Sequence, residues 1–202
     1  MTTNEIITTI MAGLSLIISG ITAYLTLFSR FKSSILPKRR IILTQITGTP
    51  NLILECEFYN AGAKPGSIED LMITVIHDET GSEFQFAPYL IKSQFNIFAK
   101  YQISDFAPFS GISLSSKDRR ELYIAFKPLL PQFLPPKSGV FTIHTSAKID
   151  GDSEWITSPR TFSLRLNESL VDKWTGSSGE AYQIEAIEIG KSREMYFGRR
   201  KK

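Results

Sequence analysis

The sequence has 202 residues, of which 42% are hydrophobic and 21% charged, and its formal net charge is +3. This hydrophobic content excludes a disordered chain, and the single cysteine, Cys56, excludes a disulfide within the chain. Residues 41–190 carry 12 basic and 18 acidic side chains. Such an acidic stretch offers no basic surface large enough to bind a nucleic-acid groove, so we do not expect nucleic acid as a partner.

The first element expected along the chain is a transmembrane helix. Residues 6–28 contain no charged side chain, and at about 1.5 Å per residue a helix of this length crosses a hydrocarbon core of roughly 30 Å. The alternative is a cleaved secretory signal, which starts with basic residues and has an apolar run of about 7–15 residues. Residues 1–5 contain no basic residue. The sequence therefore favours a retained helix after a short outer N-terminus at residues 1–5.

One stripe of this helix collects small and hydroxyl side chains, spaced alternately by four and three residues. Small residues let two helices approach closely, and hydroxyl groups can bond across the contact. In the alternative interpretation, the hydroxyls bond to their own helix. The stripe is a candidate helix–helix contact, and its members are Thr8, Ala12, Ser15, Ser19, Thr22 and Thr26.

A basic segment, residues 29–40, follows the helix and is predicted to be a juxtamembrane linker. It has five basic side chains and no acidic one, and no basic residue precedes the helix. Because Lys and Arg near a membrane span are retained on the cytoplasmic side, we expect a single-pass protein of the cell membrane with its N-terminus outside and its C-terminal domain in the cytoplasm. The basic residues attract anionic lipids by roughly 1 kcal/mol each. These membrane-proximal basic residues are Arg30, Lys32, Lys38, Arg39 and Arg40.

Residues 41–190 are expected to form one domain in which apolar residues recur with a period of two. In the first run, Leu52, Leu54, Cys56 and Phe58 alternate with other residues. This period is typical of strands with one buried face, and turn residues separate the runs. Short strands joined by such turns predict a mainly β sandwich or barrel. The strands are expected over residues 52–59, 71–76, 122–127, 141–149 and 162–166.

Part of this domain resembles bacterial immunoglobulin-like domains. Residues 58–62 (Phe-Tyr-Asn-Ala-Gly), then Pro65 and residues 68–71 (Ile-Glu-Asp-Leu), resemble their second and third strands. Leu114 and residues 122–128 resemble a strand that follows in those domains. The resemblance covers residues 41–166 and extends to small single-pass bacterial membrane proteins with this layout. It implies an immunoglobulin-like β-sandwich, although the disulfide that packs against a tryptophan in antibody domains is absent, since Cys56 is the only cysteine. The resemblance implies no active site.

The residue types that carry catalysis or bind metals do not form a recognisable motif. His77 and His144 fall on separate expected strands, whereas a zinc site needs several Cys or His residues at defined spacing. Residues 150–154 concentrate acidic side chains, but they lack the spacing and distal glutamate of an EF-hand loop and fall where a hairpin should turn. We therefore expect a protein that is not an enzyme and has no cofactor or metal.

An aromatic segment, residues 84–109, contains eight of the 23 aromatic residues of the chain. Most aromatic side chains are buried, and the segment is explained if it covers one end of the sandwich. Eight rings are nevertheless more than one strand pair buries on one face, so we also consider an exposed patch for a protein partner or for the membrane interface. The candidate partner patch comprises Phe95, Phe98, Tyr101, Phe106 and Phe109.

A second basic flank, residues 191–202, holds six basic side chains and one acidic residue, Glu194. This tail is either a solvated extension or a second contact with anionic lipids.

Together these features predict a membrane-anchored β-sandwich interaction module, which acts as a non-catalytic binding or scaffold subunit of a membrane-associated complex. Its expected partners are the lipid bilayer and either a protein partner or a second copy of the chain through the transmembrane helix. A membrane-tethered ligand sensor that signals through helix contacts is the alternative function. A hydrolase whose site carries no recognisable motif is a third.

Overall fold

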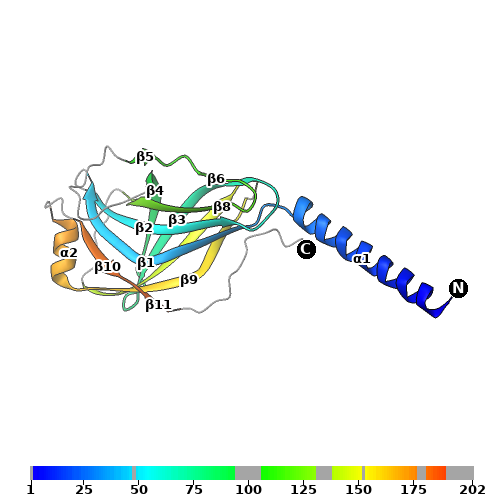
Figure 1. Ribbon diagram of the computed structural model, residues 1–202. Helices are drawn as coiled ribbons and strands as arrows, with labels where there is room; N and C mark the ends of the chain where they lie inside the picture. Colours follow the sequence, from blue (N-terminus) through cyan, green and yellow to red (C-terminus); the bar gives the residue numbers. More distant parts are fainter. Residues whose placement is uncertain are drawn as a thin grey trace.

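The computed structural model describes residues 2–46, 49–93, 106–130, 138–151, 153–176 and 181–189. These residues form two helices and eleven strands, with the first helix projecting from one end of a β domain (Figure 1). The elements are α1 (Thr3–Phe28), β1 (Ser33–Ile46), β2 (Thr49–Asn60), β3 (Gly66–His77), β4 (Glu83–Lys92), β5 (Ala107–Pro108), β6 (Ile112–Leu114), β7 (Arg119–Pro128), β8 (Gly139–Ile149), β9 (Trp155–Leu166), α2 (Glu168–Thr175), β10 (Tyr182–Glu185) and β11 (Ile187–Glu188).

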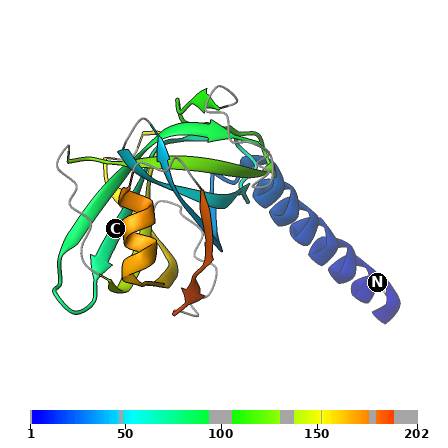
Figure 2. The same cartoon turned by 90° about the vertical axis from the view of Figure 1, so that its left-hand side faces the viewer.

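The strands join into one antiparallel sheet that curls into a near-barrel. Their order is β10-β1-β2-β7-β4-β3-β8-β9-β11, with β5 paired to β4 and β6 paired to β3. Viewed from the α2 side, the strands surround the core and α2 lies across the front (Figure 2). The prediction of a mainly β domain preceded by an apolar helix is confirmed, and the β domain is a sandwich or near-barrel. The immunoglobulin-like assignment stays a prediction.

Strands β10 and β11 close the near-barrel, because they are adjacent in the chain but pair with opposite ends of the sheet order. Strand β10 pairs with β1, and β11 pairs with β9. Between them, the Ala186 N–H donates to the Arg39 carbonyl at 2.8 Å, and just after β11 the Ile189 N–H donates to the Thr161 carbonyl at 3.0 Å. Glu188 lies 3.6 Å from Arg39 and 3.8 Å from Arg160, so its carboxylate bridges the two sides of the seam.

The main core is built from one face of each long strand. In β2, Leu52, Leu54, Cys56 and Phe58 belong to the main buried cluster, whereas Ile53 on the opposite face belongs to a second, smaller cluster. This alternation is the pattern of a pleated strand with its two faces in different environments. The five runs with a period of two are thus confirmed as parts of β2, β3, β7, β8 and β9.

Helix α2 covers the end of the near-barrel opposite α1. Its N-cap is Asn167, whose side chain accepts a hydrogen bond from the Leu170 N–H at 2.9 Å. Val171 and Trp174, three residues apart, lie on the helix face that meets the core, and both are buried. Since α2 has only eight residues, this contact rather than intrinsic propensity stabilises it.

Strand β1 includes most of the segment that is predicted as a linker. It begins at Ser33 and pairs with β2, with a register shift across residues 38–40 before pairing resumes at Ile41. The linker is therefore shorter than residues 29–40. Ile35 and Pro37 are buried ahead of the shift, but the three basic residues of this bulge interrupt the apolar alternation that would have marked a strand.

Candidate functional site at the helix–domain junction

The segment that leaves α1, residues 29–32, is hydrogen-bonded to the turn between β2 and β3. The Ala63 and Lys64 N–H groups donate to the Ser29 carbonyl at 3.1 and 3.2 Å, and the Ala63 N–H also donates to the Ser29 hydroxyl at 2.8 Å. The Ala61 N–H donates to the Lys32 carbonyl at 2.8 Å. The helix is thus joined to the domain by an ordered segment rather than by a flexible linker.

The buried side chain of Asn60 organises this junction. Its oxygen accepts hydrogen bonds from the Lys32 N–H at 3.2 Å and the Gly62 N–H at 2.8 Å. Its amide nitrogen donates to the carbonyls of Lys64 and Ser115, both at 2.8 Å. A side-chain amide has two donor hydrogens and two acceptor lone pairs, so Asn60 uses its full capacity to join three segments of the chain.

Two further contacts explain why the segment after α1 lies so close to the domain. A β-carbon at Gly62 would overlap the carbonyl oxygen of Arg30, so this close approach requires glycine. The ring of Phe31 packs over Gly66 and against the main core. The junction therefore combines backbone hydrogen bonds with apolar packing.

The five predicted membrane-proximal basic residues fall into two groups. Arg30 and Lys32 lie in the junction and are exposed. Lys38 is bonded to Glu55 at 2.6 Å on the neighbouring strand, and this hydrogen bond raises the pKa of the Lys38 ammonium above its usual value despite partial burial. The remaining two lie on β1 as well: Arg39 contacts Glu188, and Arg40 is the register partner of Glu185. The structure does not bring these three strand residues to the junction.

The predicted helix-contact stripe lies on a helix whose residues are all exposed. The hydroxyls of Thr8 and Thr22 donate to carbonyls of their own helix at 2.8 Å, and that of Thr26 does the same. These three hydroxyls therefore match the alternative interpretation of internal bonding. The role of the other members as a helix–helix contact stays a prediction; they are Ala12, Ser15 and Ser19.

The predicted aromatic partner patch is only partly within the described residues. Phe106 is buried, and it packs with Ile42, Ile53 and Ala125 in the second cluster. Phe109 is partly buried against the main core. These two rings contribute to the fold rather than offering a free surface. The other three predicted members, Phe95, Phe98 and Tyr101, lie outside the described residues.

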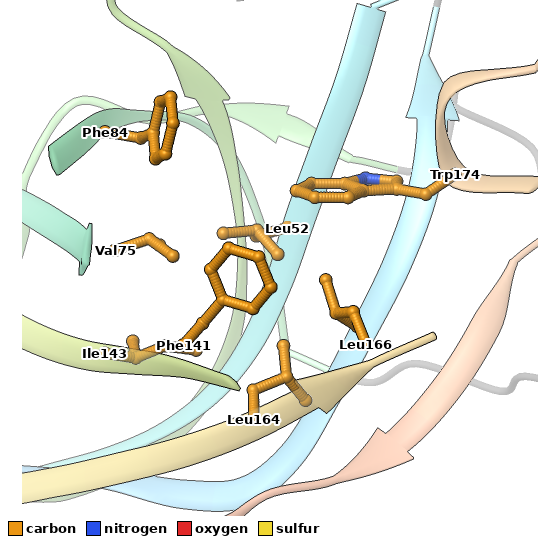
Figure 3. A pocket seen from close by; sticks show the side chains of 8 residues that line it. All are labelled: Leu52, Val75, Phe84, Phe141, Ile143, Leu164, Leu166 and Trp174. Carbon is orange, nitrogen blue, oxygen red and sulfur yellow. The ribbon is translucent and has the colours of Figure 1, made fainter. Parts of the chain in front are cut away.

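An apolar pocket lies under α2, where the indole ring of Trp174 reaches over the core (Figure 3). The Trp174 Nε1–H donates to the Asn51 carbonyl at 3.0 Å, which fixes the ring. The free volume is about 10 Å³, close to the minimum that one water molecule needs. The space under Trp174 is therefore too small for a small-molecule ligand in this conformation. The lining residues are Leu52, Val75, Phe84, Phe141, Ile143, Leu164, Leu166 and Trp174.

The titratable residues considered for catalysis or metal binding lie apart in the fold. Burial raises the pKa of the Cys56 thiol, so this cysteine is not a reactive thiolate. His77 is buried at the end of β3 beside Phe141, and His144 lies on β8 near Thr161. Within the described part of the chain, no three His, Cys, Asp or Glu side chains are grouped so that they could hold a metal ion.

Sequence reasoning missed the residues that build the junction. The turn at residues 60–66 is recognisable from its Asn, Gly and Pro residues, but its contact with the segment after α1 has no local signature. Lys64 lies at the junction because its N–H bonds to Ser29, and Lys117 because its N–H bonds to Gly62 in the same turn.

Comparison with protein-family models finds no match, and comparison with curated proteins finds none either. Among solved structures, the chain is similar to a family 123 glycoside hydrolase from Clostridium perfringens, with 11% identity and a TM-score of 0.35. The match covers 68% of this chain and 28% of that chain. A likeness this distant carries no argument about family or activity.

Proposed function

We propose that this chain is a membrane-anchored interaction module in which α1 crosses a bilayer and the β domain serves as a non-catalytic binding or scaffold subunit. The observation that carries the proposal is the contrast between α1 and the rest of the protein. Helix α1 has 26 residues, is long and apolar enough to span a membrane, and buries none of its residues against the described domain. Soluble monomers rarely leave so large an apolar surface exposed.

The junction supports a role in presenting the domain at a fixed position. A flexible linker would let the domain sample many orientations, whereas the segment after α1 is held by the Asn60 side chain and by Phe31. The domain would therefore meet its partners in one orientation relative to the bilayer. We place the domain in the cytoplasm, because Arg30 and Lys32 follow α1 whereas Glu5 is the only charged residue before the apolar run.

The small size of the space under Trp174 supports interaction through the outer surface of the domain. Small-molecule sites are typically cavities of about 300–1,000 Å³, far larger than the space under Trp174. A partner would instead contact the outer surface of the domain.

A ligand sensor is the second candidate, and the junction favours it too, because an ordered connection would transmit a movement of the domain to α1. A ligand would have to displace Trp174 to enter the near-barrel. Ligand-dependent shifts in the thermal unfolding of the full chain test this candidate, and the absence of a shift across a metabolite panel counts against it.

Fractionation tests the anchor. After lysis and an alkaline carbonate wash, the tagged full chain should stay in the membrane pellet, and recovery in the supernatant would contradict the proposal. A C-terminal tag should also resist protease added to intact cells and become sensitive after permeabilisation.

A pull-down in mild detergent tests the interaction. The full chain should retain at least one protein that a matched control, residues 1–32 fused to the same tag, does not retain. A partner held equally by both chains would assign the interaction to α1 alone, and a reproducibly solitary full chain would remove the support for a scaffold role.

A further inference from the structure

We propose that four basic side chains around the exit of α1 bind the phosphate groups of anionic lipids. The inference rests on the proposed function, since it requires that α1 cross the bilayer. We call these side chains the junction cations: Arg30, Lys32, Lys64 and Lys117.

The junction cations come from three segments that are distant in sequence. Arg30 and Lys32 follow α1 directly, whereas Lys64 belongs to the turn between β2 and β3, and Lys117 to the turn between β6 and β7. The Lys64 N–H donates to the Ser29 carbonyl at 3.2 Å. The Lys117 N–H donates to the Gly62 carbonyl at 3.4 Å. These hydrogen bonds hold both turns beside the end of the helix.

The ion pairs among the described residues leave the charges of these four side chains uncompensated, although the Lys117 ammonium donates to the Ala61 carbonyl. All four are exposed, and none forms an ion pair with another residue of the described ranges. The segments 29–32, 60–66 and 115–118 contain one acidic residue, Asp118, which is bonded to Arg120 at 3.0 Å. The junction therefore carries a local excess of positive charge on an otherwise acidic domain.

The length of α1 places this charge at the depth of the lipid phosphates. At about 1.5 Å per residue, the helix exceeds a hydrocarbon core of roughly 30 Å by about two turns. Its last turns carry Tyr24 and Phe28, with ring centroids 5.7 Å apart, and aromatic residues are enriched at the membrane interface. Arg30 and Lys32 follow within four residues. The source of the phosphates is therefore the bilayer that α1 crosses.

Reconstitution of the full chain tests the proposal. The chain is inserted into nanodiscs of phosphatidylcholine mixed with phosphatidylglycerol, and native mass spectrometry counts the phosphatidylglycerol retained after release into detergent. We expect the wild-type chain to retain phosphatidylglycerol selectively. The Lys64→Gln/Lys117→Gln variant should retain it roughly tenfold less, because each cation near an anionic surface contributes on the order of a fewfold in affinity.

The matched control is Lys127→Gln/Lys173→Gln, which removes two exposed lysines remote from the junction and should retain phosphatidylglycerol like the wild type. Because the Lys117 side chain also donates to the Ala61 carbonyl, a second variant, Lys32→Gln/Lys64→Gln, removes charge without that bond. Equal thermal midpoints in phosphatidylcholine alone show that the variants are folded.

The outcomes separate this inference from the proposed function. A chain that inserts but shows no preference for phosphatidylglycerol, or whose preference survives both junction variants, overturns the lipid site and leaves the anchor standing. If soluble inorganic phosphate abolishes the preference for phosphatidylglycerol, the lipid site is also overturned, since the site would then bind a free anion. A chain that does not insert at all contradicts the proposed function itself.

Discussion

The two helices lie at opposite ends of the near-barrel and are stabilised in opposite ways. Helix α1 has 26 residues and buries none of them, whereas α2 has eight residues and buries Val171 and Trp174. Helix α2 is explained by the domain that it covers, since its apolar side faces the core. Helix α1 carries no charged side chain between residues 6 and 28 and contacts no core, so nothing in the described domain accounts for its apolar side chains. Under the proposed function, the apolar side chains of α1 are surrounded by lipid.

The attachments of the two helices differ in the same way. At the α2 end, a tryptophan ring closes an apolar interior. At the α1 end, hydrogen bonds of the Asn60 side chain join three segments that carry exposed basic residues. The two ends should therefore respond differently to substitution. Changes at the α2 end should act on the free energy of unfolding alone, whereas changes at the α1 end should also alter the attachment of α1 and its response to lipid.

The largest expected effect is at the α2 end. Trp174→Ala removes a buried indole and its hydrogen bond to Asn51, so we expect the free energy of unfolding to fall by about 3–5 kcal/mol. Denaturant unfolding of the full chain in detergent measures this change. Trp155→Ala is the matched control, because Trp155 is 41% exposed, and it should cost less than about 1 kcal/mol. Similar losses for the two variants would contradict the role of Trp174.

The second prediction concerns α1. Leu16→Arg places a charge near the middle of the helix and should disfavour membrane insertion by about 2.5–3.5 kcal/mol, without changing the unfolding of the domain. A glycosylation-based insertion reporter measures the first effect and denaturant unfolding the second. Leu130→Arg is the control: Leu130 is 73% exposed and Leu16 77%. If both arginines left insertion unchanged, α1 would not be a membrane span.

The third prediction tests the junction. Asn60→Ala leaves four backbone groups without their partner, so the domain should lose about 1–3 kcal/mol or more. Hydrogen exchange should also become faster at residues 61–64, where the segment after α1 is attached. Asn167→Ala removes the N-cap of α2 and should cost about 0.5–2 kcal/mol, with unchanged exchange at residues 61–64. Slow exchange in the Asn60 variant would show that the junction does not depend on this side chain.

The smallest effect is the acid sensitivity of the turn that carries Lys117. Although desolvation opposes it, hydrogen bonds from the Ser115 N–H and from Arg120 lower the pKa of Asp118 below its usual value of 3.8. A lowered pKa means that Asp118 stabilises the fold above pH 3.8 and that this contribution is lost as the pH falls further. Asp118→Asn should therefore reduce stability slightly at pH 6 and not at pH 2. If Asp118→Asn reduced stability more at pH 2 than at pH 6, the prediction that ionised Asp118 stabilises the fold would be wrong.

The features that could be predicted from sequence are those with a local signature. Helix α1 is visible as a run without charge, and Leu52 to Phe58 reveal β2 through their alternation. Strand β1 is not among the expected strands, because the bulge at residues 38–40 interrupts its apolar alternation. Helix α2 was missed because its eight residues, about two turns, leave little periodicity around Val171 and Trp174. The junction was missed because its bonds join residues far apart in sequence: the Ala63 N–H and the Ser29 hydroxyl are 34 positions apart.

Closure of the near-barrel by β10 and β11 has a consequence for biosynthesis. The first strand, β1, acquires its second neighbour only after residues 182–185 have been synthesised. Helix α1 leaves the ribosome long before that, so membrane targeting would begin while the sheet still has an open seam. Stop codons shortly before Tyr182 should therefore yield chains that are degraded instead of accumulating in the membrane.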